Sequence, residues 1–148
     1  DWADVQRHPG MLRFTKGLIT ARRQLLDLFE GCEPDWHGVR LGQPDTGHES
    51  RSIALTFRSD GRAAHVICNA YWEPLEFELP DPGVAGGAGG DGAGGAADGA
   101  APGLAGGWRR LIDTDLASPE DLELDPARQV RVGGSYVAAA RSVVVLVA

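Results

Sequence analysis

Residues 53–69 read Ile53-Ala-Leu-Thr-Phe-Arg-Ser-Asp-Gly-Arg-Ala-Ala-His-Val-Ile-Cys-Asn69, and this stretch is the strongest indication of the fold class. Apolar side chains at positions 53, 55 and 57 alternate with smaller or polar ones, which is the two-residue period of a half-buried strand. Asp60-Gly61 then supplies two residues that tolerate the left-handed backbone conformation of a tight turn. Residues 64–69 form the returning segment. The stretch therefore predicts an antiparallel β-hairpin.

Short segments of the same kind lie on both sides of the hairpin, separated by Gly and Pro. Leu75, Phe77 and Leu79 alternate with two glutamates. Seven or eight short strands joined by turns indicate a mainly β fold, an antiparallel β-sandwich. After Ser142 the last segment is continuously apolar, which predicts a central strand covered on both faces or a strand at a domain contact. The further strands are expected at 36–40, 108–112, 129–132, 135–139 and 142–147.

The segment 9–30 has the pattern of an amphipathic helix. Apolar residues at 14, 18, 21, 25 and 28 recur at helical spacing. Pro9 suits the first turn, and Gly31 is expected to end the helix in the left-handed conformation. The apolar face is wider than one stripe, so we expect the helix to pack against more than one surface. The residues that widen it are Met11, Leu12, Ile19, Leu26 and Phe29.

Residues 83–107 differ in composition from the rest of the chain, because 20 of these 25 residues are Gly or Ala. Such side chains bury too little surface to offset the entropy of ordering, so we expect a flexible surface loop. The segment lacks the GxxxxGK[ST] pattern of a phosphate-binding loop. The chain is thus expected to divide into a helical segment, 1–31, and a β domain, 32–148, that carries the loop.

Composition narrows the possible functions. The 148 residues carry a formal net charge of −7, which argues against binding nucleic acid or an anionic membrane by charge neutralisation. No run of 18 apolar residues and no signal-peptide pattern occurs, so we expect a cytoplasmic location. Cys32 and Cys68 are far apart in the sequence and are expected to be reduced thiols rather than zinc ligands. We expect no metal and no cofactor.

Catalytic patterns are sparse. Asp113 and Asp115 could form an acid pair, but a capping or turn cluster is the simpler explanation, and we favour it. His37, His48 and Glu49 lack the spacing of a metal site, and Cys68 beside Asn69 has no base near it in the sequence. No catalytic residue is therefore predicted.

Aromatic residues are the better functional candidates, because sugars often bind to aromatic faces flanked by polar groups. Trp36, Tyr71, Trp72 and Trp108 are spread over the strand region. Each of them is also compatible with a core position. Trp36, Tyr71 and Trp72 are candidates for a sugar platform, and Trp72, beside Glu73-Pro74, is the one expected to be exposed.

Five segments of the chain resemble, in their order along the sequence, segments at the C-terminal end of isoamylase-type glycogen debranching enzymes. These enzymes are glycoside hydrolases of the α-amylase superfamily. One of them is Asn69-Ala-Tyr-Trp-Glu-Pro-Leu-Glu-Phe-Glu-Leu-Pro80, which is similar to an Asn-Ala…Phe-x-Leu-Pro segment of that family; the match rests on the five segments together and not on any single one. Apart from the Gly/Ala-rich loop, the resemblance spans the chain. The other segments are Asp1-Trp2 with 12–23, 36–39 with 43–45 and 50–55, 108–114, and 136–146.

The resemblance implies that the helix at 9–30 is the last helix of a (β/α)8 barrel and that the β domain supports that barrel. The family's catalytic carboxylates lie on the barrel, upstream of the position that corresponds to Asp1, so none can be assigned here. Glycogen or a maltooligosaccharide would be the substrate of the parent enzyme, and this segment alone would be inactive. The alternative is a free-standing carbohydrate-binding or protein-interaction β-sandwich module.

Overall fold

A computed structural model describes residues 4–83 and 107–148. The expected flexible loop at 83–107 lies outside the described residues, except for its two end residues. Among the described residues, no helix combines the length and the apolar character needed to cross a bilayer.

The predicted helix is confirmed as α2 (Pro9–Gly31), and it follows a single helical turn, α1 (Asp4–Arg7). Pro9 stands in the first turn as expected. The expected left-handed ending at Gly31 is wrong, because Gly31 is the last residue of the helix and has no positive φ, and Cys32 after it is extended, with φ −151° and ψ 155°. The Cys32 thiol donates to the Leu28 carbonyl over 3.3 Å, so one of the last carbonyls of the helix has a partner without a glycine cap.

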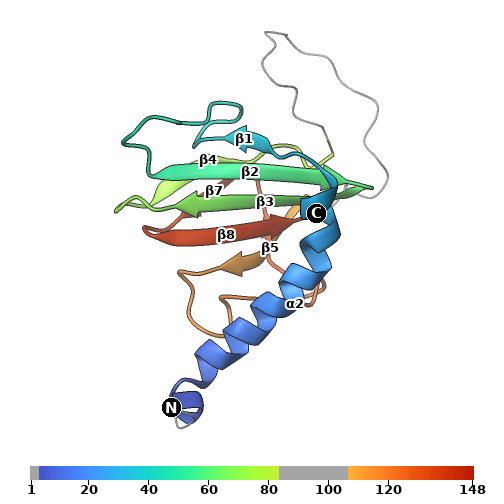
Figure 1. Ribbon diagram of the computed structural model, residues 1–148, viewed down its shortest axis with the longest axis vertical. Helices are drawn as coiled ribbons and strands as arrows, with labels where there is room; N and C mark the ends of the chain where they lie inside the picture. Colours follow the sequence, from blue (N-terminus) through green and yellow to red (C-terminus); the bar gives the residue numbers. More distant parts are fainter. Residues whose placement is uncertain (1–3, 84–106) are drawn as a thin grey trace.

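The described strands are all paired antiparallel and form two sheets (Figure 1). The larger sheet has six strands in the order β1-β2-β3-β8-β5-β6, and the smaller one pairs β4 with β7. Strand positions agree with the sequence predictions to within a few residues. The strands are β1 (Asp35–His37), β2 (Ser52–Ser59), β3 (Arg62–Asn69), β4 (Leu75–Glu78), β5 (Trp108–Asp113), β6 (Arg131–Val132), β7 (Ser135–Ala138) and β8 (Ser142–Val147).

The hairpin predicted from 53–69 is confirmed. Ser59 pairs with Arg62 across a two-residue turn in which Asp60 and Gly61 have φ of 50° and 70°. Positive φ at both central residues matches the right-handed twist of the flanking strands. The turn sets the register of the whole hairpin, so Thr56 lies opposite His65.

The expected strand at 36–40 is shorter than predicted, because β1 ends at His37. The Gly38 amide donates to the Arg40 carbonyl and begins a turn. A Cβ atom at Gly38 would lie 2.4 Å from the Gln43 carbonyl oxygen, so the turn folds back on itself too closely for any other residue. The sequence pattern contained no signal for this close approach.

The six-stranded sheet lies between two different layers. One face packs against the smaller sheet, with Phe77, Ile67 and Leu146 in that core. The opposite face packs against α2 through Leu25, Leu28 and their neighbours. Strand β8 contributes Val144 and Leu146 to the first core and Val145 to the second. The prediction of a central strand covered on both faces is therefore confirmed, and so is the mainly β, antiparallel class.

The burial pattern of β2 differs from the simple alternation of the sequence. Ala54 and Thr56 are fully buried against the smaller sheet, whereas Ile53, Leu55 and Phe57, on the helix side, are only half-buried. Large apolar residues therefore occupy the less completely covered face. The reason is the extent of α2, which crosses this face obliquely and leaves one end of the sheet uncovered (Figure 1).

Candidate functional site

Asn69, at the end of β3, holds the loop that carries two of the candidate aromatic residues. Its buried side-chain amide donates to the carbonyls of Glu73, Ala138 and Ala139 over 2.9–3.1 Å. Its side-chain oxygen accepts from the Tyr71 amide at 3.0 Å. Since both ends of the amide are used, the loop from 70 to 74 is fastened to the end of the larger sheet and to the β7–β8 turn.

Tyr71 and Trp72 form an aromatic pair on this loop. Their ring centroids are 4.0 Å apart, with an angle of 31° between the planes. Trp72 is 61% exposed, as the sequence predicted, and Tyr71 is partly buried. The Arg141 amide donates to the Tyr71 carbonyl over 3.1 Å, and Arg141 itself has a φ of 56°. The pair is therefore held by backbone contacts from two different turns.

The other two tryptophans lie elsewhere. Trp108 is 2% exposed in the core beneath the smaller sheet, and its indole N–H donates to the Pro80 carbonyl at 2.6 Å. Trp36 is 53% exposed on β1, opposite Leu55, and so lies on the helix side of the larger sheet. The structure thus brings Tyr71 and Trp72 together, and it places Trp36 in a different apolar surface.

That surface is an open apolar face, which sequence reasoning did not identify. Strand register places Trp36 beside Leu55. The next row toward the uncovered end of the sheet consists of Ile53, Cys68 and Val143 on three neighbouring strands. None of these five residues belongs to the core beneath α2. Trp36 and Val143 are exposed, and the other three are half-buried.

The open face continues onto α2. Met11 and Phe14 line a surface hollow of about 200 Å³ together with Thr114. Thr114 in turn exchanges two hydrogen bonds with Val143, so Met11 lies beside the floor of the face. Leu18 stands one heptad after Met11, on the same side of the helix. The open face therefore has a floor on the sheet and a wall on α2, and it consists of Met11, Leu18, Trp36, Ile53, Leu55, Cys68 and Val143.

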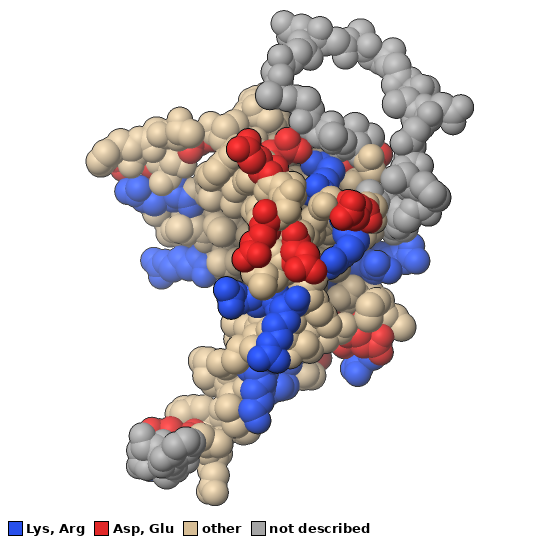
Figure 2. Space-filling model, turned by 45° about the vertical axis from the view of Figure 1, so that its right-hand side comes forward, with Lys and Arg blue, Asp and Glu red and all other residues tan. Residues whose placement is uncertain are grey.

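The opposite flank of α2 is charged. Lys16 and Arg23 are exposed there, and acidic Asp27 and Glu30 follow toward the end of the helix. Figure 2 shows the basic side chains along the helix and acidic ones gathered beyond them. Arg13 pairs with Asp121, which fastens the helix to the segment after β5. The flank with Met11 and Leu18 is the more apolar of the two, although the exposed Arg22 follows Leu18 by one turn on that side.

The acid pair expected as a turn is confirmed as one. Asp113 is buried and its carboxylate accepts from the Asp115 amide at 3.1 Å and from the Tyr136 hydroxyl at 2.5 Å. Burial, and then the contact with Asp113, raises the pKa of Tyr136. Asp115 is exposed. Asp113 thus ties the smaller sheet to the larger one and is not free to act as an acid or base.

The metal candidates remain apart. His37 is buried, whereas the His48 side chain is 98% exposed and contacts Glu49 at 3.2 Å. In the part of the chain that the structure describes, no group of three potential ligands could hold a metal ion. Neither described cysteine is in a disulfide; both are partly buried, and burial raises the pKa of the Cys68 thiol.

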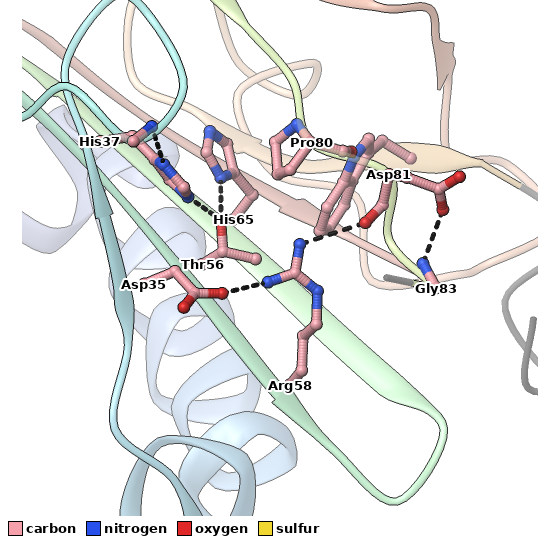
Figure 3. A network of polar contacts seen from close by, with 10 residues as sticks. Asp35, His37, Thr56, Arg58, His65, Pro80, Asp81 and Gly83 are labelled. Atoms are coloured by element: carbon pink, nitrogen blue, oxygen red, sulfur yellow. Dashed lines mark hydrogen bonds and ion pairs between the residues drawn. The ribbon is translucent and has the colours of Figure 1, made fainter. Parts of the chain in front are cut away.

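His37, Thr56 and His65 form a buried chain of hydrogen bonds (Figure 3). The Gly42 amide donates to His37 Nδ1 at 2.9 Å, so the proton of the neutral His37 ring is on Nε2, which donates to Thr56 Oγ1 at 3.0 Å. The Thr56 hydroxyl then donates to His65 Nδ1 at 2.8 Å. His65 Nε2 has no partner among the described residues.

Burial keeps this chain neutral. Desolvation is the main cause that lowers the pKa of His65 from 6.5 to about 3, and the nearby His37 and Arg58 add to it. Desolvation also lowers the pKa of His37, and Arg58 adds to the shift while Asp35 opposes it. His65 is fully buried, so it cannot meet a substrate. The chain is a polar part of the core rather than a catalytic site.

No protein-family model matches this chain, and no curated protein matches it. Function is therefore inferred from the resemblance of its segments and from the geometry of the open face and the aromatic pair.

Proposed function

We propose that this chain is the non-catalytic C-terminal part of an isoamylase-type glycogen debranching enzyme, a glycoside hydrolase that cleaves α-1,6-glucosidic branch linkages. The observation that carries the proposal is the open face. Exposed apolar side chains on neighbouring parts of a helix and a sheet are typical of a contact with another domain. The partner would be the catalytic (β/α)8 barrel of the parent chain, covering α2 and the uncovered end of the sheet.

In this proposal α2 is the last helix of the barrel, and residues 32–148 are the C-terminal domain. The two sheets would be the unequal layers of its antiparallel β-sandwich. A helix shared by two domains needs apolar residues on two flanks, and α2 has them. Leu25 and Leu28 pack on the sheet, while Met11 and Leu18 are exposed beside it.

Catalysis would take place on the barrel, where a pair of carboxylates performs glycoside hydrolysis. Asp113, one of the two aspartates of the possible acid pair, is hydrogen-bonded to the Tyr136 hydroxyl and to the Asp115 amide of the turn. The role proposed for this segment is therefore mechanical. It would hold the last barrel helix in place and exclude water from the barrel's flank, in a cytoplasmic enzyme that acts on glycogen.

The alternative proposal is a free-standing carbohydrate-binding or protein-interaction module. The exposed Tyr71–Trp72 pair favours it, because such pairs suit sugar rings. The two proposals differ in what covers the open face. In a free-standing module, no barrel domain would cover the open face.

The test adds the purified chain to an isoamylase-type debranching enzyme that is shortened to end before the helix corresponding to α2, and measures the reducing ends released from glycogen. We expect no activity from the chain alone, little from the shortened enzyme, and recovery when the two are mixed. Debranching by the chain alone would overturn the proposal. So would a mixture no more active than the shortened enzyme, and that result would favour the free-standing module.

A further inference from the structure

We propose that Tyr71 and Trp72 form a binding site for an α-glucan chain on the surface of the β domain. A carbohydrate ring presents a face of C–H groups that packs on an aromatic ring, while its hydroxyls need polar groups at the edge. The exposed Trp72 offers the aromatic face. The choice of α-glucan among carbohydrates rests on the proposed function.

The pair is rigid before any ligand arrives. Tyr71 packs against one side of the Trp72 ring. The backbone beneath the pair is fixed by Asn69 and by the Arg141 amide, and the Ala70 amide donates to the Arg51 carbonyl at 2.7 Å. A side chain that is already ordered loses little entropy on binding, so a single exposed ring in this setting contributes more affinity than one on a loose loop.

A shallow, mainly apolar hollow lies beneath the start of the loop that carries the pair, and the exposed Arg141 is the polar group that it offers to a ligand. It has a volume of about 270 Å³ and is lined by residues from the ends of β3 and β8, including Asn69, Ala70, Arg141 and Ser142. Pockets for drug-sized ligands run from roughly 300 to 1,000 Å³, so this hollow suits something as small as one sugar ring. The exposed Arg141 guanidinium can donate to hydroxyls.

Charge favours a neutral ligand. The chain carries a net charge of −7, which disfavours a phosphorylated or otherwise anionic ligand. Glu73, next to Trp72, is also exposed and would repel an anion. Cys68 and Val143 line the hollow and also belong to the open face, so the proposed barrel contact would cover that side of the hollow and leave the exposed Trp72 as the main glucan contact.

The test is calorimetric titration of the full chain with maltoheptaose, with the β-linked cellohexaose as the comparison sugar. We expect millimolar affinity for maltoheptaose. The Trp72→Ala variant should weaken it at least about tenfold, and Trp72→Phe should retain part of it. Val130→Ala removes an exposed apolar side chain from a different part of the surface, and it should bind like the parent chain. Urea unfolding midpoints check that each variant is folded.

Absence of heat at millimolar maltoheptaose, or binding that Trp72→Ala leaves unchanged, would overturn the site. Equal affinity for cellohexaose would overturn the assignment to α-glucan. These results would leave the proposed function standing, because recovery of the shortened enzyme is measured separately. Conversely, a chain that binds maltoheptaose through Trp72 but fails to restore the barrel would keep this site and overturn the mechanical role.

Discussion

At the scale of single residues, the buried polar groups explain why the sequence offers so few catalytic candidates. The Asp113 carboxylate accepts hydrogen bonds from the Asp115 amide in the turn and from the Tyr136 hydroxyl. Both the nitrogen and the oxygen of the Asn69 side chain are hydrogen-bonded to backbone groups. His37 and His65 are linked through Thr56 inside the core. Each residue type is common in active sites, yet here each has its partners within the fold. Their chemistry serves the arrangement of the two sheets.

The histidine chain makes stability depend on pH. An unfolded His65 takes up a proton near its ordinary pKa of 6.5, whereas the folded one does so only near 3. Between these values the unfolded state binds more protons, so the free energy of unfolding falls as the pH falls below about 6.5. We expect the chain to be about 1–2 kcal/mol less stable at pH 5 than at pH 7, measured by urea unfolding. His37 shifts in the same direction and adds to the effect.

The control for this prediction compares two histidine variants. His65→Phe should flatten the dependence on pH, whatever it does to stability at neutral pH. His48→Gln should leave the slope unchanged, because the His48 side chain is almost fully exposed. A parent chain and a His65→Phe variant with the same slope would show that His65 is not the titrating group.

At the scale of elements, the hairpin was the most predictable part of the fold. Asp60-Gly61 identifies a two-residue turn, and such a turn fixes every pair of the two strands. Counting back three residues along each strand from the turn pairs Thr56 with His65. The hydrogen bond between these two residues could therefore have been predicted from the sequence. The link to His37 could not, because β1 and β2 are joined by a long connection that sets no register.

The turn glycine gives a prediction about this element. Gly61→Ala places a Cβ on a residue with a φ of 70°, so we expect a loss of about 1 kcal/mol in the free energy of unfolding. Gly133→Ala is the matched control. Gly133 has no positive φ, and a Cβ there would meet no atom within 4 Å. It should be neutral or slightly stabilising, and equal losses in the two variants would contradict the turn assignment.

Helix α2 shows where local patterns stop being informative. Its width of apolar surface predicted two contact surfaces, and the structure accounts for one of them, the sheet. Its ending was mispredicted because Gly31 suggested a cap, whereas the Cys32 thiol supplies one hydrogen bond instead. Such a contact depends on the direction of the chain after the helix, and the sequence spacing alone does not determine that direction.

At the scale of the whole molecule, the antiparallel class was predictable and the unequal sheets were not. Strand number follows from alternation and turns, but pairing between distant strands depends on packing. The partner of β4 is β7, far along the chain beyond β5 and β6. The open face is likewise a property of the assembled sheet. Trp36, Cys68 and Val143 come from three strands and share a face only once the register is known.

The same reasoning separates the tryptophans, of which the sequence distinguished only Trp72 as an exposed residue. Trp108 belongs to the core, Trp36 to the open face and Trp72 to the aromatic pair. Only exposure and neighbours distinguish the three roles. The proposed functions of the molecule therefore lie on two adjoining surfaces, one for a protein domain and one for a sugar.

The most direct test of the barrel contact is the affinity of this chain for the debranching enzyme shortened to end before the helix corresponding to α2, measured by sedimentation with three forms of the chain. The parent chain and Val137→Asp, which changes an exposed residue on β7, should bind equally well, because the smaller sheet covers the opposite face. The double variant Leu18→Asp/Val143→Asp charges the wall and the floor of the open face, and it should bind at least about tenfold more weakly while remaining folded. The assignment of the open face would be contradicted if the shortened enzyme did not bind the parent chain, or if it bound the double variant as tightly as the parent chain.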